Sequence, residues 1–169
     1  MGDYTMIEPY QWLVNHAEAL GFSSELCGPS SVDLRLGGFV RWVHAAPHDT
    51  KEWSEFDFGQ AGYKRVLFTP GCFYLCTTQE YVKVPPSHCA LINMRSSWAR
   101  QGLGHKMAGF VDPGFEGQIT LELETAILLN IQIGTPIVQL IYMRLTEETA
   151  KPYAGKYLGQ HGPTRAILT

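Results

Sequence analysis

The sequence predicts an all-β domain, either a sandwich, a jelly roll or a barrel, with one helix packed on the outside. Many short runs alternate apolar and polar residues, which is the pattern of strands with one buried face. Turn signals such as Pro70-Gly71, Pro85-Pro86 and Asp112-Pro113-Gly114 separate these runs. Only one segment has the spacing of an amphipathic helix. Strand-rich chains with such regular turns favour these all-β architectures.

The helix is predicted at the N-terminal end of the chain, over Ile7 to Leu20, within residues 1–21. Apolar side chains recur there at intervals of three and four residues, which places them on one helix face. Gly21 follows the last turn, and glycine commonly ends a helix at this position.

Strands are predicted wherever short apolar or alternating runs lie between turn signals. The run from Ser31 to Leu36 shows the clearest alternation. Residues 44–64 lack such a pattern and are expected to form a long excursion or an irregular hairpin. The tail, residues 151–169, is rich in Gly and Pro and is expected to be a flexible arm. The other predicted strands are Phe39–Val43, Arg65–Phe68, Phe73–Thr77, Tyr81–Val84, Cys89–Met94, Gln118–Glu124, Leu128–Ile133 and Ile137–Arg144.

Length and composition favour a single domain over residues 1–169. A chain of 169 residues can bury a sizeable core without disulfides or a structural metal. Its net charge of -3 argues against a broad nucleic-acid surface, which needs many Lys and Arg side chains. No apolar stretch is long enough to span a bilayer, so we expect a cytoplasmic protein with no membrane partner. Free thiols that pack as small apolar residues are expected at Cys27, Cys72, Cys76 and Cys89.

One motif suggests zinc chemistry but is incomplete. His16-Ala17-Glu18 matches the first half of the zinc deaminase signature, in which the His binds zinc and the Glu moves protons. The second half requires two cysteines separated by two residues, whereas Cys72 and Cys76 are separated by three. His16 and Glu18 also fit the polar face of the predicted helix. We therefore expect no zinc site and no protein ligands for any metal.

The segment from Arg95 to Arg100 combines cations and hydroxyl groups directly after a predicted strand. Its sequence is Arg95-Ser96-Ser97-Trp98-Ala99-Arg100. Such donors can surround a phosphate, but Ser and Arg are equally ordinary in a surface turn. Spacing alone leaves both interpretations open.

The order of five separated blocks resolves this choice. Together they resemble the deoxycytidine triphosphate (dCTP) deaminase family, which is part of the trimeric deoxyuridine triphosphatase (dUTPase) superfamily. The resemblance implies a distorted jelly-roll or β-clip fold, a homotrimer with active sites at subunit interfaces, and a C-terminal arm that closes over the nucleotide. The blocks are residues 29–37, 95–100, 108–117, 119–123 and 153–160.

The resemblance also implies a role for each matching side chain. Glu122 would be the general base, Arg100 would pair with it, and Ser96 would stabilise the reacting centre. Among the substrate-binding residues, Asp112 would accept a hydrogen bond from the sugar 3'-hydroxyl, Thr120 would lie against the base and Tyr153 against the deoxyribose. Mg²⁺ would arrive with the triphosphate. The other implied substrate contacts are Arg95, Ser97, Ala108, Gln139, Lys156 and Gln160.

The expected chemistry suits a carboxylate. Deamination at C4 of cytosine needs a water that loses a proton as it attacks and a proton that leaves with ammonia. Partial burial between Leu121 and Leu123 would raise the pKa of Glu122, whereas Arg100 would lower it. Without the resemblance, strand alternation would assign Glu122 to solvent with no partner.

One departure from the family pattern bears on regulation, and one resemblance to a subgroup of the family bears on the product. Met107 stands where the family usually has threonine. This difference argues against feedback inhibition by thymidine triphosphate, which in the family acts through the loop that carries this position. Gly109-Phe110 resembles the bifunctional members of the family, so we hypothesise that the chain continues from dUTP to dUMP and pyrophosphate. The alternatives are a dUTP diphosphatase without deaminase activity and a non-catalytic nucleotide-binding regulator on the same fold.

Overall fold

A computed structural model describes residues 6–44, 53–106 and 108–168 of the chain. Met107 lies outside the described residues. The helices are α1 (Tyr10–Leu20) and α2 (Ser96–Ala99), with a 3₁₀ turn over Ser24–Leu26. The strands are β1 (Val32–His44), β2 (Ser54–Asp57), β3 (Arg65–Phe68), β4 (Cys72–Lys83), β5 (His88–Met94), β6 (Leu103–His105), β7 (Phe110–Val111), β8 (Glu116–Thr125), β9 (Leu129–Gln132) and β10 (Pro136–Arg144).

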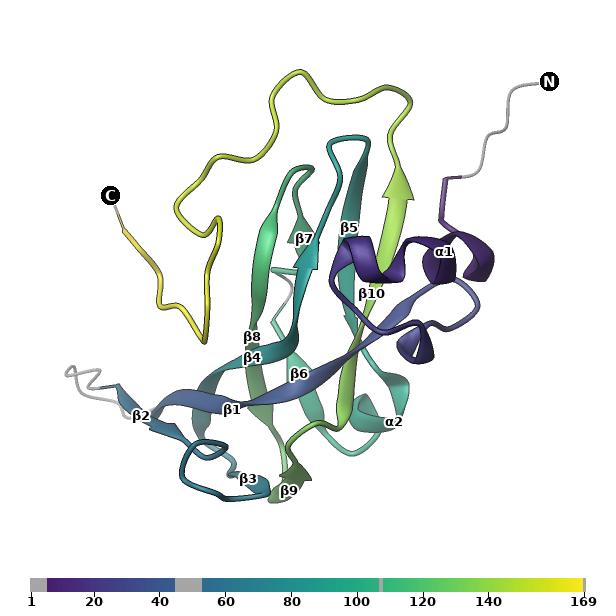
Figure 1. Cartoon of the computed structure of the whole chain (residues 1–169). Helices are drawn as coiled ribbons and strands as arrows, with labels where there is room; N and C mark the ends of the chain where they lie inside the picture. Colours follow the sequence, from purple (N-terminus) through teal and green to yellow (C-terminus); the bar gives the residue numbers. More distant parts are fainter. Residues whose placement is uncertain (1–5, 45–52, 107, 169) are drawn as a thin grey trace.

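One eight-stranded antiparallel sheet curls around the core (Figure 1). Its order is β6-β8-β4-β1-β10-β5-β7, with β2 added alongside β1, while β3 and β9 form a separate pair. The curl depends on β1, because its first residues pair with β10 and its later residues pair with β4 and β2. This architecture confirms the prediction of an all-β, jelly-roll-like fold.

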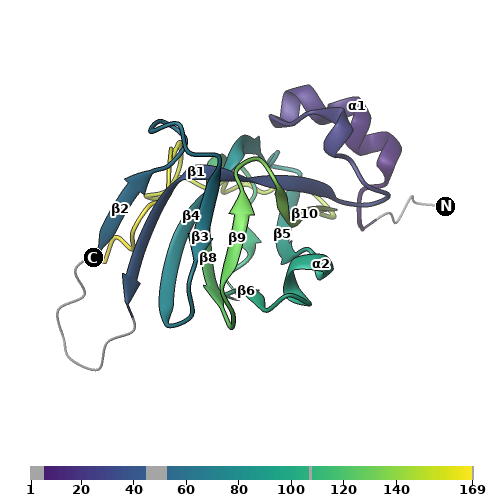
Figure 2. The same ribbon diagram turned by 90° about the horizontal axis from the view of Figure 1, so that it is seen from below.

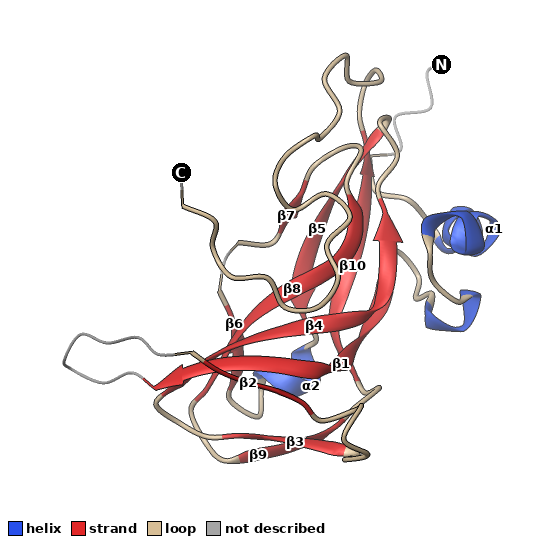
Figure 3. Ribbon diagram, turned by 60° about the vertical axis from the view of Figure 1, so that its left-hand side comes forward, coloured by secondary structure: helices blue, strands red, loops and turns tan. Residues whose placement is uncertain are grey.

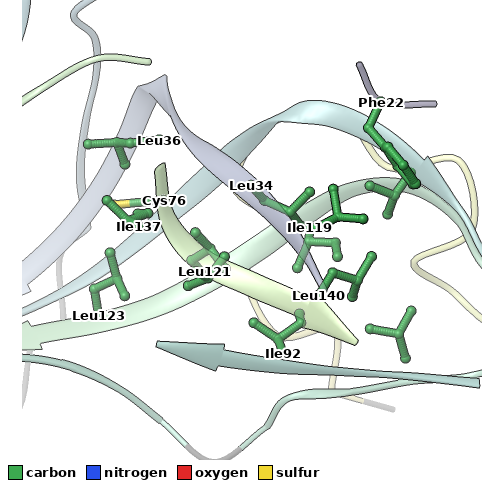
Figure 4. Packing of buried hydrophobic residues seen from close by; sticks show 14 of the residues in the cluster. Phe22, Leu34, Leu36, Cys76, Ile92, Ile119, Leu121, Leu123, Ile137 and Leu140 are labelled. Carbon is green, nitrogen blue, oxygen red and sulfur yellow. The ribbon is translucent and has the colours of Figure 1, made fainter. Parts of the chain in front are cut away.

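The core lies inside this curl (Figure 4). Leu34 and Leu36 of β1, Leu121 and Leu123 of β8 and Leu140 of β10 are fully buried there. Alternate residues of each strand point to this side, so the strands present their other faces outward. The outward face of β8 is the one that matters for the site described below.

Helix α1 packs outside the curled sheet, on the opposite side of the molecule from the end of the C-terminal tail (Figures 2 and 3). It buries Leu13, Ala17 and Leu20, as its periodicity predicts. The helix begins at Tyr10 and not at Ile7, because the residues before Pro9 pair with β10. Ile7 bridges to Met143, and the amide of Glu8 donates to the carbonyl of Tyr142.

The preceding segment is held by a buried charge cluster. The carboxylate of Glu8 is 1% exposed and lies 2.8 Å from Arg144 Nε and 3.0 Å from His88 Nε2. Paired buried charges are costly to break, so this contact fixes where the helix begins.

The predicted strands are found, with several boundaries changed by pairing. Two predicted runs merge into β1 and two more into β4, because each long strand bends without ending. Within the 44–64 segment, β2 pairs with β1 in an unbroken antiparallel register, and residues 45–52 lie outside the described residues. Four short elements were not predicted: the 3₁₀ turn over Ser24–Leu26, α2, β6 and β7.

The side chains in the rejected zinc motif have other surroundings. His16 is exposed on α1, with Nδ1 2.7 Å from the carbonyl oxygen of Trp12. All four cysteines are free, and Cys72, Cys76 and Cys89 are buried, as expected of small apolar residues. In the described part of the chain, no helix is long and apolar enough to cross a membrane.

Gly21 ends α1 in a left-handed conformation, with φ of 86°. A Cβ atom there would lie 1.9 Å from the carbonyl oxygen of Tyr81 in β4. Gly62 has nearly the same φ, 82°, but open space around it. Substitutions of these two glycines therefore distinguish the cost of backbone strain alone, at Gly62, from the cost of strain plus a clash between α1 and β4, at Gly21.

We predict that Gly62→Ala lowers the free energy of unfolding by about 1 kcal/mol, the cost of a left-handed alanine. Gly21→Ala should cost at least about 2 kcal/mol more, because α1 must also move away from β4. Urea unfolding monitored by circular dichroism measures both changes. Equal losses in the two variants would contradict the close packing of α1 on Tyr81.

Candidate active site

A cavity of about 540 Å³ lies against the outward face of β8. Strand β4, the turn around Asp112 and the C-terminal tail complete its walls, and this volume falls within the usual range for a small-molecule site. Several of the expected site residues line it, namely Ala108, Asp112, Thr120, Glu122, Tyr153 and Gln160. The remaining lining residues are Trp53, Phe73, Leu75, Ile92, Phe110, Val111, Phe115, Ile119, Tyr157, Thr164 and Ala166.

Strand pairing places Glu122 in this cavity. Glu122 lies opposite Leu75 of β4, and Thr120 lies opposite Thr77. Leu121 and Leu123 point into the core, so the alternation turns Glu122 away from it. The sequence prediction of an outward side chain is therefore right, but the tail covers this face, and Glu122 is only partly exposed.

Burial raises the pKa of Glu122 above its ordinary value. The expected lowering by Arg100 is not seen within one chain. Among the described residues, no ion pair joins Arg100 to Glu122, and Arg100 is exposed. A carboxyl group that faces a cavity can take up and release a proton during a reaction.

The turn around Asp112 forms one end of the cavity and holds the start of the tail. The amide of Tyr153 donates to the carbonyl of Pro113 at 2.7 Å, and the ring of Tyr153 lies 5.9 Å from that of Phe115. Gly114 has φ of 86°, and a Cβ atom there would lie 2.7 Å from Pro152. Glycine at this position is therefore what allows the tail to approach Asp112 so closely.

The tail then runs along β8, beside the strand that carries Glu122 (Figures 1 and 3). The amide of Gln118 donates to the carbonyl of Gln160 at 3.0 Å, and the side-chain amide of Gln160 donates back to Gln118 at 2.7 Å. Further along, the amide of Thr164 donates to Oγ1 of Thr120 at 3.0 Å. The structure thus shows the tail in a closed position over the cavity.

The other expected site residues lie outside the cavity. Arg95, Ser96, Ser97 and Arg100 belong to α2 and its flanks, where both serines are exposed. Lys156 is exposed, and its ammonium group donates to the carbonyl of Ile167 within the tail.

Arg95 and Gln139 instead contact residues of the 29–37 block. Arg95 Nη1 lies 3.2 Å from Asp33 Oδ2, and Gln139 Nε2 donates to Ser31 Oγ at 3.1 Å. Burial raises the pKa of Asp33. The charge of Arg95 and a hydrogen bond from Gln139 lower it, but by less, so the pKa stays above its ordinary value. Asp33 was not among the expected site residues, although it lies within the 29–37 block.

The electrostatics of the cavity are one-sided. Asp112 and Glu122 are its acidic residues, and no Lys or Arg is found among the described residues that line it. The cavity can therefore hold an uncharged ring and a sugar, with polar contacts from Asp112 and Thr120. A polyphosphate would need cations from elsewhere.

Comparisons with known proteins agree on one family. The model of the dCTP deaminase-like family matches residues 10–145. A protein of Sulfurihydrogenibium sp. (strain YO3AOP1), named dCTP deaminase, dUMP-forming, is 41% identical over 151 residues, covering 83% of this chain and 82% of that protein. A protein of Persephonella marina with the same name is 36% identical over 171 residues, covering 96% of this chain and 92% of that protein.

A solved structure shows the same fold. The crystal structure of 2'-deoxycytidine 5'-triphosphate deaminase from Agrobacterium tumefaciens matches with a TM-score of 0.68 at 18% identity. The match covers 85% of this chain and 49% of that one, so this chain spans about half its length.

Proposed function

Because this chain belongs to the dCTP deaminase-like family, we propose that it hydrolyses dCTP to dUTP and ammonia and then converts dUTP to dUMP and pyrophosphate. The observation that carries the proposal is the partly buried carboxyl group of Glu122, which faces a cavity that also contains Asp112 and Tyr153. Relatives named dCTP deaminase, dUMP-forming, support both steps, because they are similar to this chain over most of its length.

In the first step Glu122 acts as both base and acid. Its carboxylate takes a proton from a water molecule as the water oxygen bonds to C4 of cytosine. The same proton then goes to the exocyclic nitrogen, and the C4–N bond breaks as ammonia leaves. The remaining proton of the water moves from the oxygen at C4 to N3, which gives the uracil ring. Asp112 holds the sugar 3'-hydroxyl, Tyr153 lies against the deoxyribose, and Thr120 and Ala108 border the base.

The triphosphate end of the site comes from a second copy of the chain. No Lys or Arg is among the described residues that line the cavity, whereas Arg95, Ser96, Ser97 and Arg100 lie exposed or half-exposed outside it. In a homotrimer with a head-to-tail interface, each cavity would meet this face of its neighbour. Arg100 of the neighbouring copy then orients Glu122, and its Ser96 stabilises the tetrahedral centre.

The tail completes the site on the phosphate side. Gln160 already lies in the cavity, and Lys156 is four residues away on the same exposed segment. We infer that the tail opens for nucleotide binding and that Lys156 exchanges its contact with Ile167 for the triphosphate. The short hydrogen-bonded contacts between the tail and β8 suit such a reversible closure.

The second step hydrolyses the bond between the α- and β-phosphates. Water attacks the α-phosphorus, pyrophosphate leaves, and Asp112 is placed to help remove the proton from that water. Mg²⁺ enters with the triphosphate, whose oxygens are ligands that it prefers. Within the described residues, no group of three or more His, Cys, Asp or Glu side chains could hold a metal ion of its own.

The proposal predicts the products of dCTP and the effect of removing the base. Purified protein with Mg²⁺ and dCTP should release ammonia and dUMP, separated by chromatography. Glu122→Gln should lower the rate by roughly 10²–10⁴-fold, because an amide cannot take the proton. Glu124→Gln is the matched control, since Glu124 lies on the same strand but pairs with Lys106 at 2.6 Å outside the cavity.

Three results would count against the proposal. An absence of uracil nucleotides would exclude the deaminase, and full activity of Glu122→Gln would exclude Glu122 as the base. Accumulation of dUTP without dUMP would remove the second step alone.

The pairing of Glu122 with a neighbour's Arg100 predicts a pH effect. Activity needs ionised Glu122, so it falls as the pH drops through the pKa of that group. Burial raises this pKa and a nearby guanidinium lowers it. Arg100→Gln removes the lowering, so the acidic limb of kcat/KM should move about one to three pH units upward.

Arg100→Lys keeps the charge and should leave the limb close to that of the unmodified protein. An acidic limb of Arg100→Gln that stays in place or moves to lower pH would show that Arg100 does not act on Glu122.

A further inference from the structure

The cavity extends beyond Glu122 to two aromatic side chains. Phe73 precedes Leu75 by two residues on β4, so both side chains lie on the face of the sheet that carries Glu122. The ring of Trp53 meets that of Phe73 edge to face, with centroids 5.9 Å apart. We call Trp53 and Phe73 the aromatic wall.

The proposed function sets which part of a nucleotide this wall faces, and the inference rests on that function. The sugar, bonded to N1 of the base, lies near Asp112 and Tyr153. Glu122 acts at C4, which is across the ring from N1, and C5 is the carbon next to C4. The C4–C5 edge of the base therefore points toward Leu75 and the aromatic wall.

The surroundings of that edge are apolar. Leu75 is opposite Glu122 in the sheet and 6% exposed, and it brings no polar group. The wall adds two aromatic rings, and contact between an aromatic ring and an aliphatic group is favourable because it buries apolar surface. On β8, the charged residue nearest to Glu122 is Glu124, and its carboxylate forms an ion pair with Lys106. A hydrogen atom or a methyl group at C5 suits these neighbours, whereas a charged substituent does not.

We propose that the aromatic wall accepts a methyl group at C5, so that the protein also deaminates 5-methyl-dCTP. The chemistry is unchanged: water adds at C4, Glu122 moves its proton to the exocyclic nitrogen, and ammonia leaves. The product is thymidine triphosphate, or thymidine monophosphate and pyrophosphate if the second step follows. Trp53 and Phe73 would thus determine specificity without touching the reacting atoms.

The test is the ratio of kcat/KM for 5-methyl-dCTP to that for dCTP. In the unmodified protein this ratio should be near one or up to about fourfold higher, the gain from burying one methyl group. Phe73→Ala and Trp53→Ala should each lower the ratio about threefold or more, because the methyl group loses a contact that the C5 hydrogen scarcely makes.

Phe56→Ala is the control, because Phe56 is an aromatic residue of β2 that is 40% exposed and packs on Phe58 outside the cavity. It should leave the ratio unchanged. If an alanine variant does not fold, Phe73→Leu serves instead. It should lower the ratio by less than the threefold expected for alanine, because leucine keeps part of the apolar contact.

Three results would overturn the inference. They are a ratio below about one tenth in the unmodified protein, a ratio that rises when the wall is removed, and a ratio that does not respond to Trp53 or Phe73. The first two would show a wall that excludes the methyl group.

Failure of the proposed function gives a different result, because dCTP itself would then not be deaminated. In that event calorimetry with the two nucleotides still tests the wall. 5-Methyl-dCTP should bind at least as tightly as dCTP, and Phe73→Ala should abolish any advantage. Tenfold weaker binding of the methylated nucleotide would contradict the inference.

Discussion

The antiparallel pairing of β4 with β8 is the constraint on which the rest of the structure depends. It sends Leu121 and Leu123 into the core and Glu122 to the opposite face. The same register places Leu75 beside Glu122, and β8 also offers its outer face to the tail. One pair of strands thereby supplies part of the core and the floor of the site, so a register slip of one residue would disrupt both.

The charge distribution is the basis for our proposal that two copies of the chain share each site. Glu122 and Asp112 lie in a cavity lined largely by apolar side chains, where burial raises the pKa of Glu122. The cations that we propose for the triphosphate lie on and around α2, and one of them, Arg95, is held by Asp33. Separation of carboxylates and cations within the chain prevents them from neutralising each other. A neighbouring copy can then bring the two groups together around the substrate.

The elements that carry their own pattern could be predicted from the sequence. Gly21 marks the end of α1, and the run from Arg65 to Phe68 matches β3. The start of α1 could not be predicted, because pairing of Ile7 with β10 overrides the helical spacing. Elements as short as β6, β7 and α2 show no period. For the site, strand alternation predicts that Glu122 faces outward, but only the fold shows that the tail covers it. Trp53 and Phe73 carry no local signal, since their role depends on strands that are distant in sequence.

Complementation between inactive subunits tests the shared site most directly. Glu122→Gln and Arg100→Gln chains would be co-expressed with different tags, and assemblies containing both would be purified and assayed with dCTP. In a trimer with sites between neighbours, each assembly that contains both variants has about one third of its interfaces joining an intact Glu122 to an intact Arg100. We predict recovery of about one third of normal deaminase activity in these mixed assemblies. Mixed assemblies no more active than either variant alone would show that Glu122 and Arg100 do not act together across an interface.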